Sequence, residues 1–463
     1  MILREDACDP QDPGPRQRRW TLVATSLGFA VVQLDVSVVN VAIKPIGVSL
    51  GGGVSALQWV VSAYTLAFAA LILSAGALAD RIGAKRVFIG GFVGFTCASA
   101  ACGLAPSVSV LIAARAVQGV GAALLVPSSL TLLNHTHTTA VERARAIGLW
   151  AAGASAALSA GPLIGGVLIA TLGWRAIFFI NAPIGLAGIL LTSRWAAETP
   201  RSPERGLDTI GQLTAIVCLT AVAASTIEGG THGFADPAVL AGYAVALLAG
   251  VAFIAAERRR AQPMLPLGLF RSGTFRCATA IGLLVNIAFY GLIFVLSLFF
   301  QRGQDLSPLQ TGLAFAPMTA AVMAANVLAG RVATRLGAWW VIRIGAALMG
   351  AGACALLTID AGQSYLEMAV QLAGIGFGLG LVVPIMTSTL LGSVDRARSG
   401  IAAGTLNTAR QTGSVIGVAL YGSLIAHGQL VEGLRLALLI SAGLALAVTA
   451  LTLGIARNGE GRT

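Results

Sequence analysis

The chain contains fourteen apolar stretches, each long enough to cross a lipid bilayer as a helix. A spanning helix needs about 20 mostly apolar residues. We predict spans at residues 20–43, 57–79, 87–105, 108–132, 146–170, 176–194, 209–228, 237–256, 276–300, 308–331, 340–358, 366–390, 401–426 and 436–456. Only 11% of the 463 residues are charged, against about 25% in soluble domains. The sequence therefore predicts an all-α integral membrane protein.

The basic residues predict which side of the membrane each loop faces, because Lys and Arg concentrate in cytoplasmic loops. With the N-terminus in the cytoplasm, 24 of the 30 basic residues lie on the cytoplasmic side. The exceptions are Lys44, Arg175, Arg302 and Arg435 outside, and Arg115 and Arg410 within spans. We therefore expect both termini in the cytoplasm, with residues 1–19 as a cytoplasmic tail rather than a cleavable signal peptide.

The type and distribution of the basic residues also indicate the host and exclude one class of partner. Twenty-eight of the 30 are arginine, and Ala and Gly are abundant. This composition favours a GC-rich bacterial genome, and hence a bacterial inner membrane. The net charge of +11 is spread between apolar spans, so we do not expect nucleic acid as a partner.

Four short motifs occur twice in the chain, at offsets of 252 to 257 residues. They are Gly76–Val87 with Gly330–Val341, Gly119–Gly121 with Gly376–Gly378, Glu142–Arg145 with Asp395–Arg398, and Gly161–Gly165 with Gly413–Gly417. Six spans occupy only about 195 residues, so residues 209–256 have no counterpart. We predict six-helix bundles at 20–195 and 276–456 with two inserted helices between them. Parallel repeats of this kind suit a transporter with its site at the repeat interface.

Asp35 is the only one of the 19 acidic residues that lies well inside a predicted span. An acid at the centre of a spanning helix costs roughly 2.5–3.5 kcal/mol on insertion scales, so it normally has a partner and a role. Arg115 is the natural partner, because both residues fall roughly 10–12 Å below the outer surface at 1.5 Å per residue. We expect a proton-coupling pair. The alternative is an acid that serves helix packing alone.

Arg410 is a second cation within the membrane, about nine residues into its span. Either it faces a substrate cavity, or its side chain reaches back toward the cytoplasm. The sequence leaves both interpretations open.

Two glycine-containing segments are candidates for conformational change. Between the second and third spans lie Gly76, Asp80, Arg81, Gly83, Lys85 and Arg86. These residues suit a tight turn with charge pairs, or simply a solvated loop. In the fifth span lie Gly153, Gly161, Pro162, Gly165 and Gly166. They suit a bent, closely packed helix that acts as a hinge, or ordinary small-residue packing.

The energy source can be narrowed from what the sequence lacks. Neither of the two lysines follows a glycine, so the chain has no phosphate-binding loop for ATP. His135 and His137 lie at a cytoplasmic loop, and we do not expect them to form a metal site. We therefore predict a gradient-driven transporter rather than an enzyme, with no cofactor and the proton as coupling ion.

Together these motifs resemble the major facilitator superfamily, and within it the fourteen-helix drug:proton antiporter branch. The resemblance covers residues from about 20 to 456. The motifs that carry it are Leu34–Ala42, Gly76–Arg86, Arg115–Gly121, Gly153–Gly166, and Gly173-Trp174-Arg175 with Phe178, Asn181 and Pro183. The first motif departs from the branch pattern, because Ile43-Lys44-Pro45 shifts the usual proline and adds a cation.

The resemblance implies roles for the motifs. Asp35 would couple protons to substrate and Arg115 would assist proton transfer. The Gly76–Arg86 loop would act as a cytoplasmic gate, and the Gly161-Pro162 helix would serve exchange rather than symport.

The charges within the spans suggest the kind of substrate. No second acid lies well inside a span, while Arg115 and Arg410 add positive charge. We therefore expect a neutral, weakly anionic or at most monovalent amphiphile. Candidate residues of the substrate cavity are Asn40, Trp59, Tyr64, Gln118, Asn286, Tyr290 and Arg410, with Phe68, Trp150, Phe289 and Phe294 as further aromatic candidates. Each aromatic side chain has the alternative of packing or facing lipid.

The leading hypothesis is proton-driven export of a drug or antibiotic by a monomer that works by alternating access. A proton-coupled transporter of one specific metabolite is the alternative. A non-transporting membrane receptor is a third hypothesis, which the absence of a sizeable soluble domain disfavours.

Overall fold

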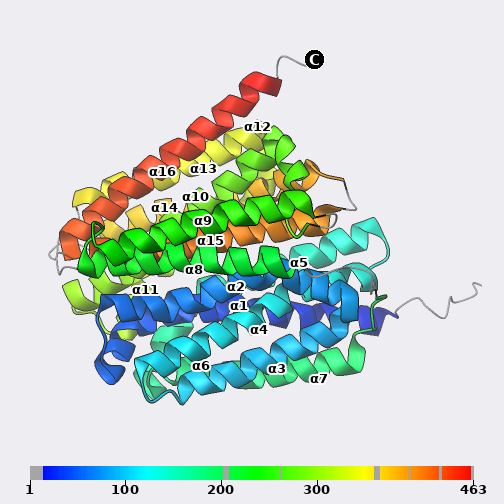
Figure 1. The fold of residues 1–463 in the computed structure, drawn as a ribbon, viewed down its shortest axis with the longest axis horizontal. Coiled ribbons are helices and arrows are strands. Elements are labelled where there is room, and N and C mark those ends of the chain that lie inside the picture. The colour runs from blue at the N-terminus through cyan, green and yellow to red at the C-terminus, as the bar shows by residue number, and fades with distance from the viewer. Residues whose placement is uncertain are drawn as a thin grey trace, which may run out of the picture.

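The computed structural model describes residues 14–201, 208–260, 263–358, 365–395, 398–426 and 430–459, and these form long helices that run side by side (Figure 1). The helices are α1 Pro15–Leu50, α2 Val54–Ile82, α3 Ala84–Gly103, α4 Val108–Thr136, α5 Ala140–Leu172, α6 Ala176–Phe179, α7 Asn181–Trp195, α8 Thr209–His232, α9 Pro237–Arg259, η1 Leu267–Arg271, α10 Gly273–Leu298, η2 Phe299–Gly303, α11 Pro308–Ala314, α12 Ala316–Leu336, α13 Ala338–Ala355, η3 Leu356–Thr358, α14 Tyr365–Gly392, α15 Ser399–Leu424 and α16 Leu430–Gly459.

These helices match the fourteen predicted spans. Within the described residues, thirteen segments are long and apolar enough to cross a membrane, counting α6 with α7, α10 with η2, α11 with α12, and α13 with η3. The fourteenth span is α15, which has 26 residues but carries more polar side chains. The all-α fold is therefore confirmed.

The helices extend past the apolar stretches that predicted them. α1 begins at Pro15 rather than at residue 20, because proline fits the first turn of a helix and arginine is a good helix former. It also continues through Pro45 to Leu50. Residues 1–13 of the predicted tail lie outside the described residues.

The two halves of the chain repeat one arrangement. In Figure 1, α1–α7 form the lower half of the molecule and α10–α16 the upper half, with α8 and α9 between them on the near face. Equivalent helices pack together in each half: α1 on α5 and α10 on α15, α2 on α4 and α12 on α14, and α3 on α4 and α13 on α14.

The repeated glycines explain why these pairs approach so closely. A Cβ atom at Gly119 of α4 would overlap the Tyr64 carbonyl of α2. A Cβ atom at Gly376 of α14 would overlap the Met318 carbonyl of α12 in the same way. Small residues let helix backbones meet in a membrane, so the sequence repeat preserves the same helix contact in both halves.

The two ends of the bundle differ in how tightly the halves meet. We call the end where α1 begins and α16 finishes the terminal end, and the opposite end, with Leu50 and Val54, the distal end. Residues 31–43 of α1 and 285–301 of α10 and η2 are all buried, whereas the terminal parts of α1 and α10 are partly exposed. The two halves are therefore packed together toward the distal end.

Hydrogen bonds join the halves in the same region. Gln301 on η2 donates from Nε2 to the Val41 carbonyl of α1 at 3.0 Å. Gln58 on α2 donates from Nε2 to the Val418 and Ala419 carbonyls of α15 at 3.1 and 2.8 Å. These side chains are fully buried, so the contact excludes water.

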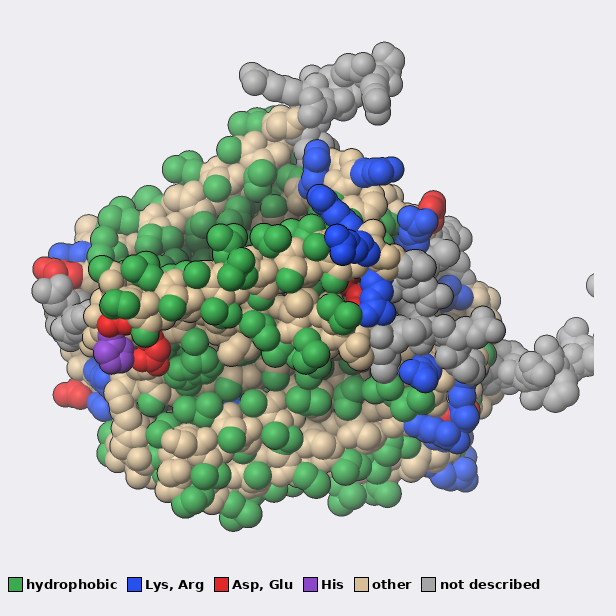
Figure 2. Space-filling view, viewed as in Figure 1, with side chains coloured by type: hydrophobic (Ala, Val, Ile, Leu, Met, Phe, Trp, Pro, Cys, Tyr) green, Lys and Arg blue, Asp and Glu red, His purple; other side chains and the backbone are tan. Residues whose placement is uncertain are grey.

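The surface matches a protein surrounded by lipid. Figure 2 shows Lys and Arg side chains gathered at the terminal end, while the sides of the bundle are hydrophobic and uncharged. The insert helix α9 is the least covered, and Leu247, Leu248 and Val251 on it are more than half exposed. Such an apolar face would be unfavourable in water and is favourable in a bilayer.

Candidate functional site

Asp35 of α1 and Arg115 of α4 form an ion pair inside the first half of the chain. Arg115 donates from NH1 to Asp35 Oδ2, and both side chains are 1% exposed. α1 and α4 run in opposite directions, and the pair meets at the matching depth that the sequence predicts. The structure confirms this contact, while its part in proton coupling stays a prediction.

Polar side chains from the neighbouring helices complete a closed network around the carboxylate. Asp35 Oδ1 accepts hydrogen bonds from Gln118 Nε2 at 2.8 Å and from Asn181 Nδ2 at 3.0 Å. Both donors also bond to the Ser99 hydroxyl of α3, at 3.2 and 2.9 Å. All these side chains are at most 2% exposed, so the carboxylate has no direct access to water in this conformation.

Arg115 is held from three sides. Its Nε donates to the Val60 carbonyl of α2 at 3.2 Å, and NH1 donates to Gln118 Oε1 at 2.7 Å. Its guanidinium carbon lies 4.3 Å from the centre of the Tyr64 ring. A buried cation over an aromatic face gains about 2 kcal/mol when it is desolvated, so Tyr64 helps to stabilise the buried charge.

The sequence did not single out Asn181 or Ser99 as site residues. Asn181 begins α7, where the sixth span breaks between α6 and α7. The break turns its side chain toward α1 and α3. Small polar residues at helix breaks commonly serve capping or turns, so their sequence position alone gives no functional signal. The motif resemblance around Gly173 and Pro183 was the one available indication for Asn181.

The loop between α2 and α3 is bound to the segment after α7. Gly83 takes a positive φ of 100°, which glycine adopts at little cost. Lys85 Nζ donates to the Ser193 carbonyl at 3.0 Å, and Arg86 pairs with Glu198 at 3.4 Å. Contacts of Gly83–Arg86 therefore tie the loop to its own half of the chain. Arg81 is exposed beside them, and the gate function of Gly76–Arg86 is untested.

The glycine–proline motif of α5 lies at the seam between the two halves. A Cβ atom at Gly161 would overlap the Ser37 hydroxyl of α1, and one at Gly165 would lie 3.2 Å from the Val38 carbonyl. On the other side, a Cβ atom at Gly166 would lie 2.8 Å from the Pro308 carbonyl of α11.

Two further members of the motif differ in their surroundings. The Pro162 carbonyl lies against Gly312 of α11, whereas a Cβ atom at Gly153 would find its nearest neighbour at 4.0 Å. The motif thus packs α5 against both halves, and its hinge function remains a prediction.

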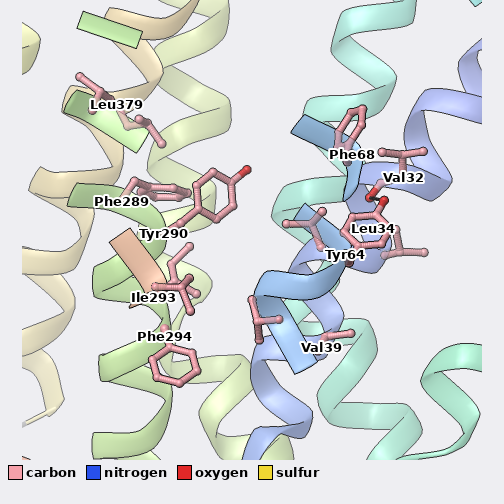
Figure 3. Packing of buried hydrophobic residues seen from close by; sticks show 14 of the residues in the cluster. Val32, Leu34, Val39, Tyr64, Phe68, Phe289, Tyr290, Ile293, Phe294 and Leu379 are labelled. Carbon is pink, nitrogen blue, oxygen red and sulfur yellow. Dashed lines mark hydrogen bonds between the residues drawn. The ribbon is translucent and has the colours of Figure 1, made fainter. Parts of the chain in front are cut away.

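Aromatic side chains from the two halves face each other beside the ion pair. In Figure 3 the Tyr290 hydroxyl on α10 points toward Tyr64 and Phe68 on α2, with Phe289 next to it. Tyr64 donates its hydroxyl to the Val32 carbonyl at 3.3 Å. Tyr290 lies near both Tyr64 and Arg410. Tyr64, Tyr290 and Arg410, three of the candidate cavity residues, therefore belong to one connected group.

The other candidate residues are more dispersed. Asn286 lies one turn before Tyr290, and its Nδ2 donates to the Gly282 carbonyl at 2.7 Å. Asn40 belongs to the distal contact, where its carbonyl accepts from Ser297. Trp59 packs in a separate cluster with Leu66, Ala223 and Val415, against the insert.

Of the further aromatic candidates, Trp150 packs away from Tyr290, whereas Phe294 lies one turn after it on the same face of α10. Trp150 stacks on Phe29 and donates to Ser129 within the first half. Phe294 is fully buried on α10.

Known proteins share this architecture. Residues 25–418 match the sequence model of the Major Facilitator Superfamily. A methylenomycin A resistance protein of Streptomyces coelicolor is 39% identical over 404 residues, which cover 87% of this chain and 85% of the relative. The multidrug resistance protein Stp of Mycobacterium tuberculosis is 37% identical over 411 residues, covering 89% and 76%.

The fold also matches a solved structure. The human organic anion transporter MFSD10 superposes with a TM-score of 0.65 at 16% identity, covering 95% of this chain and all of that chain. The match over most of the sequence, two similar relatives and the repeated helical halves lead to one conclusion: the chain belongs to the Major Facilitator Superfamily.

Proposed function

We propose that the protein is a proton-driven antiporter that exports a hydrophobic or amphiphilic compound, such as a drug or antibiotic, from a bacterial cell. The buried ion pair between Asp35 and Arg115 carries this proposal. Both side chains are 1% exposed, so an acid and a base meet here away from water inside a transporter fold. Relatives named for methylenomycin A resistance and multidrug resistance support export as the direction.

The orientation follows from the basic residues. Lys and Arg gather at the terminal end, which we assign to the cytoplasm of the inner membrane. The distal end then faces outward, and the two halves are packed together there. In this conformation a compound would enter from the cytoplasmic side, between the partly exposed terminal parts of α1 and α10.

The ion pair suggests how protons and substrate are coupled. Protonation of Asp35 removes its negative charge and weakens its attraction to Arg115. α1 and α4 then lose their strongest contact, and α1 is the helix that carries the distal bonds to α10 and η2. Rearrangement of α1 would open the distal seam, so proton binding and outward opening would be linked in a monomer.

Transport into inverted membrane vesicles with an imposed pH gradient tests the proposal. Methylenomycin A, the compound named for one relative, serves as the first probe. We expect acid-inside vesicles to accumulate it with the unchanged protein and to lose the gradient-dependent part with Asp35→Asn. Flux that is independent of the gradient and unaltered in this variant would falsify proton coupling.

A further inference from the structure

Arg410 on α15 is a cation within the membrane that has no acidic partner among the described residues. Its Nε atom is buried and forms no hydrogen bond. Arg115, by contrast, is neutralised by Asp35. Away from the ends of the described spans, Arg115 is therefore part of an ion pair, whereas Arg410 is a positive charge without an acidic partner. An unpaired arginine at this depth costs several kcal/mol unless it meets an anion or water.

The depth of Arg410 rules out the interpretation that it simply reaches for the membrane surface. It lies 11 residues after Ser399 and 14 before Leu424, or about 16 and 21 Å along the helix at 1.5 Å per residue. An arginine side chain is shorter than either distance. The side chain is nevertheless partly exposed, although α15 is covered by α10, α2 and α8. Arg410 therefore faces an accessible space inside the protein.

The neighbours of Arg410 hold it in place and leave its donors free. Its stem packs on α10, where a Cβ atom at Gly282 would lie 3.3 Å from Arg410 Cγ. Tyr290, also on α10, lies near the Arg410 guanidinium. One turn further along α15, Ser414 is 1% exposed, and its hydroxyl has no hydrogen-bond partner. Residues four apart lie on the same helix face, so two unsatisfied donors line up there.

Apolar rings lie next to these donors. Phe289 and Tyr290 pack edge to face at 5.4 Å between ring centres. Figure 3 shows both on α10, opposite Phe68 and Tyr64 of the other half. The group therefore combines a cation and a free hydroxyl with aromatic surface from both halves. A carboxylate matches the fork of a guanidinium, and an apolar body suits the rings.

We propose that Arg410, with Ser414 and the Tyr290 hydroxyl, binds the anionic group of the exported compound, and that the substrates are amphiphilic monoanions such as aromatic carboxylates. One guanidinium at this site matches one anionic group, so we assign a valence of one. This inference rests on the proposed export function and names the substrate class for the same site. Tyr290 also lies near Tyr64, whose ring is in contact with Arg115, so a bound anion would lie close to the Asp35 ion pair.

Binding of a matched pair of probes tests the inference. The probes are 1-pyrenebutyrate and its neutral amide, which share one ring and differ in charge. Energy transfer from the protein's tryptophans to pyrene reports binding to the purified full chain in phosphatidylcholine nanodiscs. We expect the unchanged protein to bind the acid at least tenfold more tightly than the amide.

Variants at Arg410 separate charge from packing. We expect Arg410→Gln to lower acid affinity to that of the amide and to leave amide binding unchanged, which also shows that the variant is folded. Arg410→Lys should restore part of the preference, because it keeps the charge but loses the fork. Arg276→Gln removes an equal charge at the exposed start of α10 and should have no effect.

Two results overturn the inference. One is a protein that binds the acid no more tightly than the amide, including no binding of either. The other is an Arg410→Gln variant that keeps the preference. The binding assay uses no pH gradient, so it is independent of proton coupling. Suppose that the preference for the acid depends on Arg410 while transport does not depend on the pH gradient. The anion site would then be supported, and proton coupling would be wrong.

Discussion

Arg115 bridges Asp35 and Tyr64: its guanidinium donates to the carboxylate and lies 4.3 Å from the centre of the phenol ring. The cation is therefore stabilised by one charged group and by one aromatic face. Each contact comes from a different helix, α1 and α2, so a change at the carboxylate alters the packing of three helices at once. An ion pair in this position can therefore link protonation of the Asp35 carboxylate to a shift of these three helices.

Removal of one partner of the ion pair should destabilise the protein more than removal of both. Arg115→Met leaves an uncompensated buried carboxylate, and breaking a buried pair in this way costs about 3–5 kcal/mol. Asp35→Asn combined with Arg115→Met should regain most of that stability while transport stays lost. Thermal unfolding of the purified variants measures the cycle, with Arg276→Met as the control. If the single Arg115→Met variant is as stable as the unchanged protein, the Asp35 carboxylate is not destabilised by the loss of its partner, and the prediction is wrong.

The fold and the depth of the ion pair could be predicted because both follow from regular spacing. Apolar runs fix the helices, and residues counted from the helix ends place Asp35 and Arg115 level with each other. Asn181 and Ser99 escape this reasoning, because their contacts depend on the break between α6 and α7. No spacing rule fixes which way a helix break turns a side chain.

The outer end of the first span shows a second limit. The sequence flagged Lys44 and Pro45 as a departure from the family pattern without indicating a contact. In the structure Lys44 donates to the Gln301 carbonyl and pairs with Asp305 at 3.1 Å. Both partners lie more than 250 residues away. Contacts between the halves depend on how the two bundles dock, and the local sequence does not encode that docking.

Two glycines of the α5 motif should respond differently to the same substitution. Gly161→Ala places a Cβ on the Ser37 hydroxyl and 3.3 Å from the Val38 nitrogen. Overpacking of this kind costs about 1–3 kcal/mol, so its melting temperature should fall by several degrees. At Gly153 a Cβ atom has room, with its nearest neighbour at 4.0 Å. The free energy of unfolding of Gly153→Ala should therefore lie within about 0.5 kcal/mol of that of the unchanged protein. Equal melting temperatures would argue against a tight seam between α1 and α5.

Gln301 should help to keep the distal side closed. Its Nε2 bonds to the Val41 carbonyl and to the Ser297 hydroxyl, both at 3.0 Å. Gln301→Ala removes these bonds, each worth about 1 kcal/mol, and should raise the open population about fivefold or more. Val41→Cys, in a chain with Ala at the native cysteines, reports opening through its rate of reaction with a membrane-impermeant maleimide applied to whole cells.

The matched control for that experiment is Gln310→Ala. The hydrogen bonds of Gln310 go to Ser307 and cap its own helix. They do not connect the two halves, so labelling at Val41→Cys in this variant should stay slow. Equal labelling in both variants would show that Gln301 does not hold the seam. Labelling only from the cytoplasmic side would reverse the assigned orientation.

A buried carboxyl pair should hold the terminal end of the insert. Glu257 of α9 is 3% exposed, accepts from the Leu265 nitrogen at 2.9 Å, and lies against Asp208, which pairs with Arg260 at 3.4 Å. A Cβ atom at Gly211 would touch Asp208 Oδ2 at 2.6 Å and Glu257 Oε1 at 2.7 Å. Asp208 Oδ2 and Glu257 Oε1 are both buried and form no hydrogen bond, so two acceptors meet here without a donor between them.

Two substitutions at Glu257 distinguish this arrangement from simple burial. Glu257→Gln keeps an acceptor for the Leu265 nitrogen and supplies a permanent donor for Asp208, so its melting temperature should equal or exceed that of the unchanged protein. Glu257→Leu is similar in size but leaves the Leu265 N–H without its acceptor, at a cost of about 1–3 kcal/mol. Thermal unfolding compares the two directly. A leucine variant that is as stable as the glutamine variant would show that the carboxyl pair does not anchor the insert.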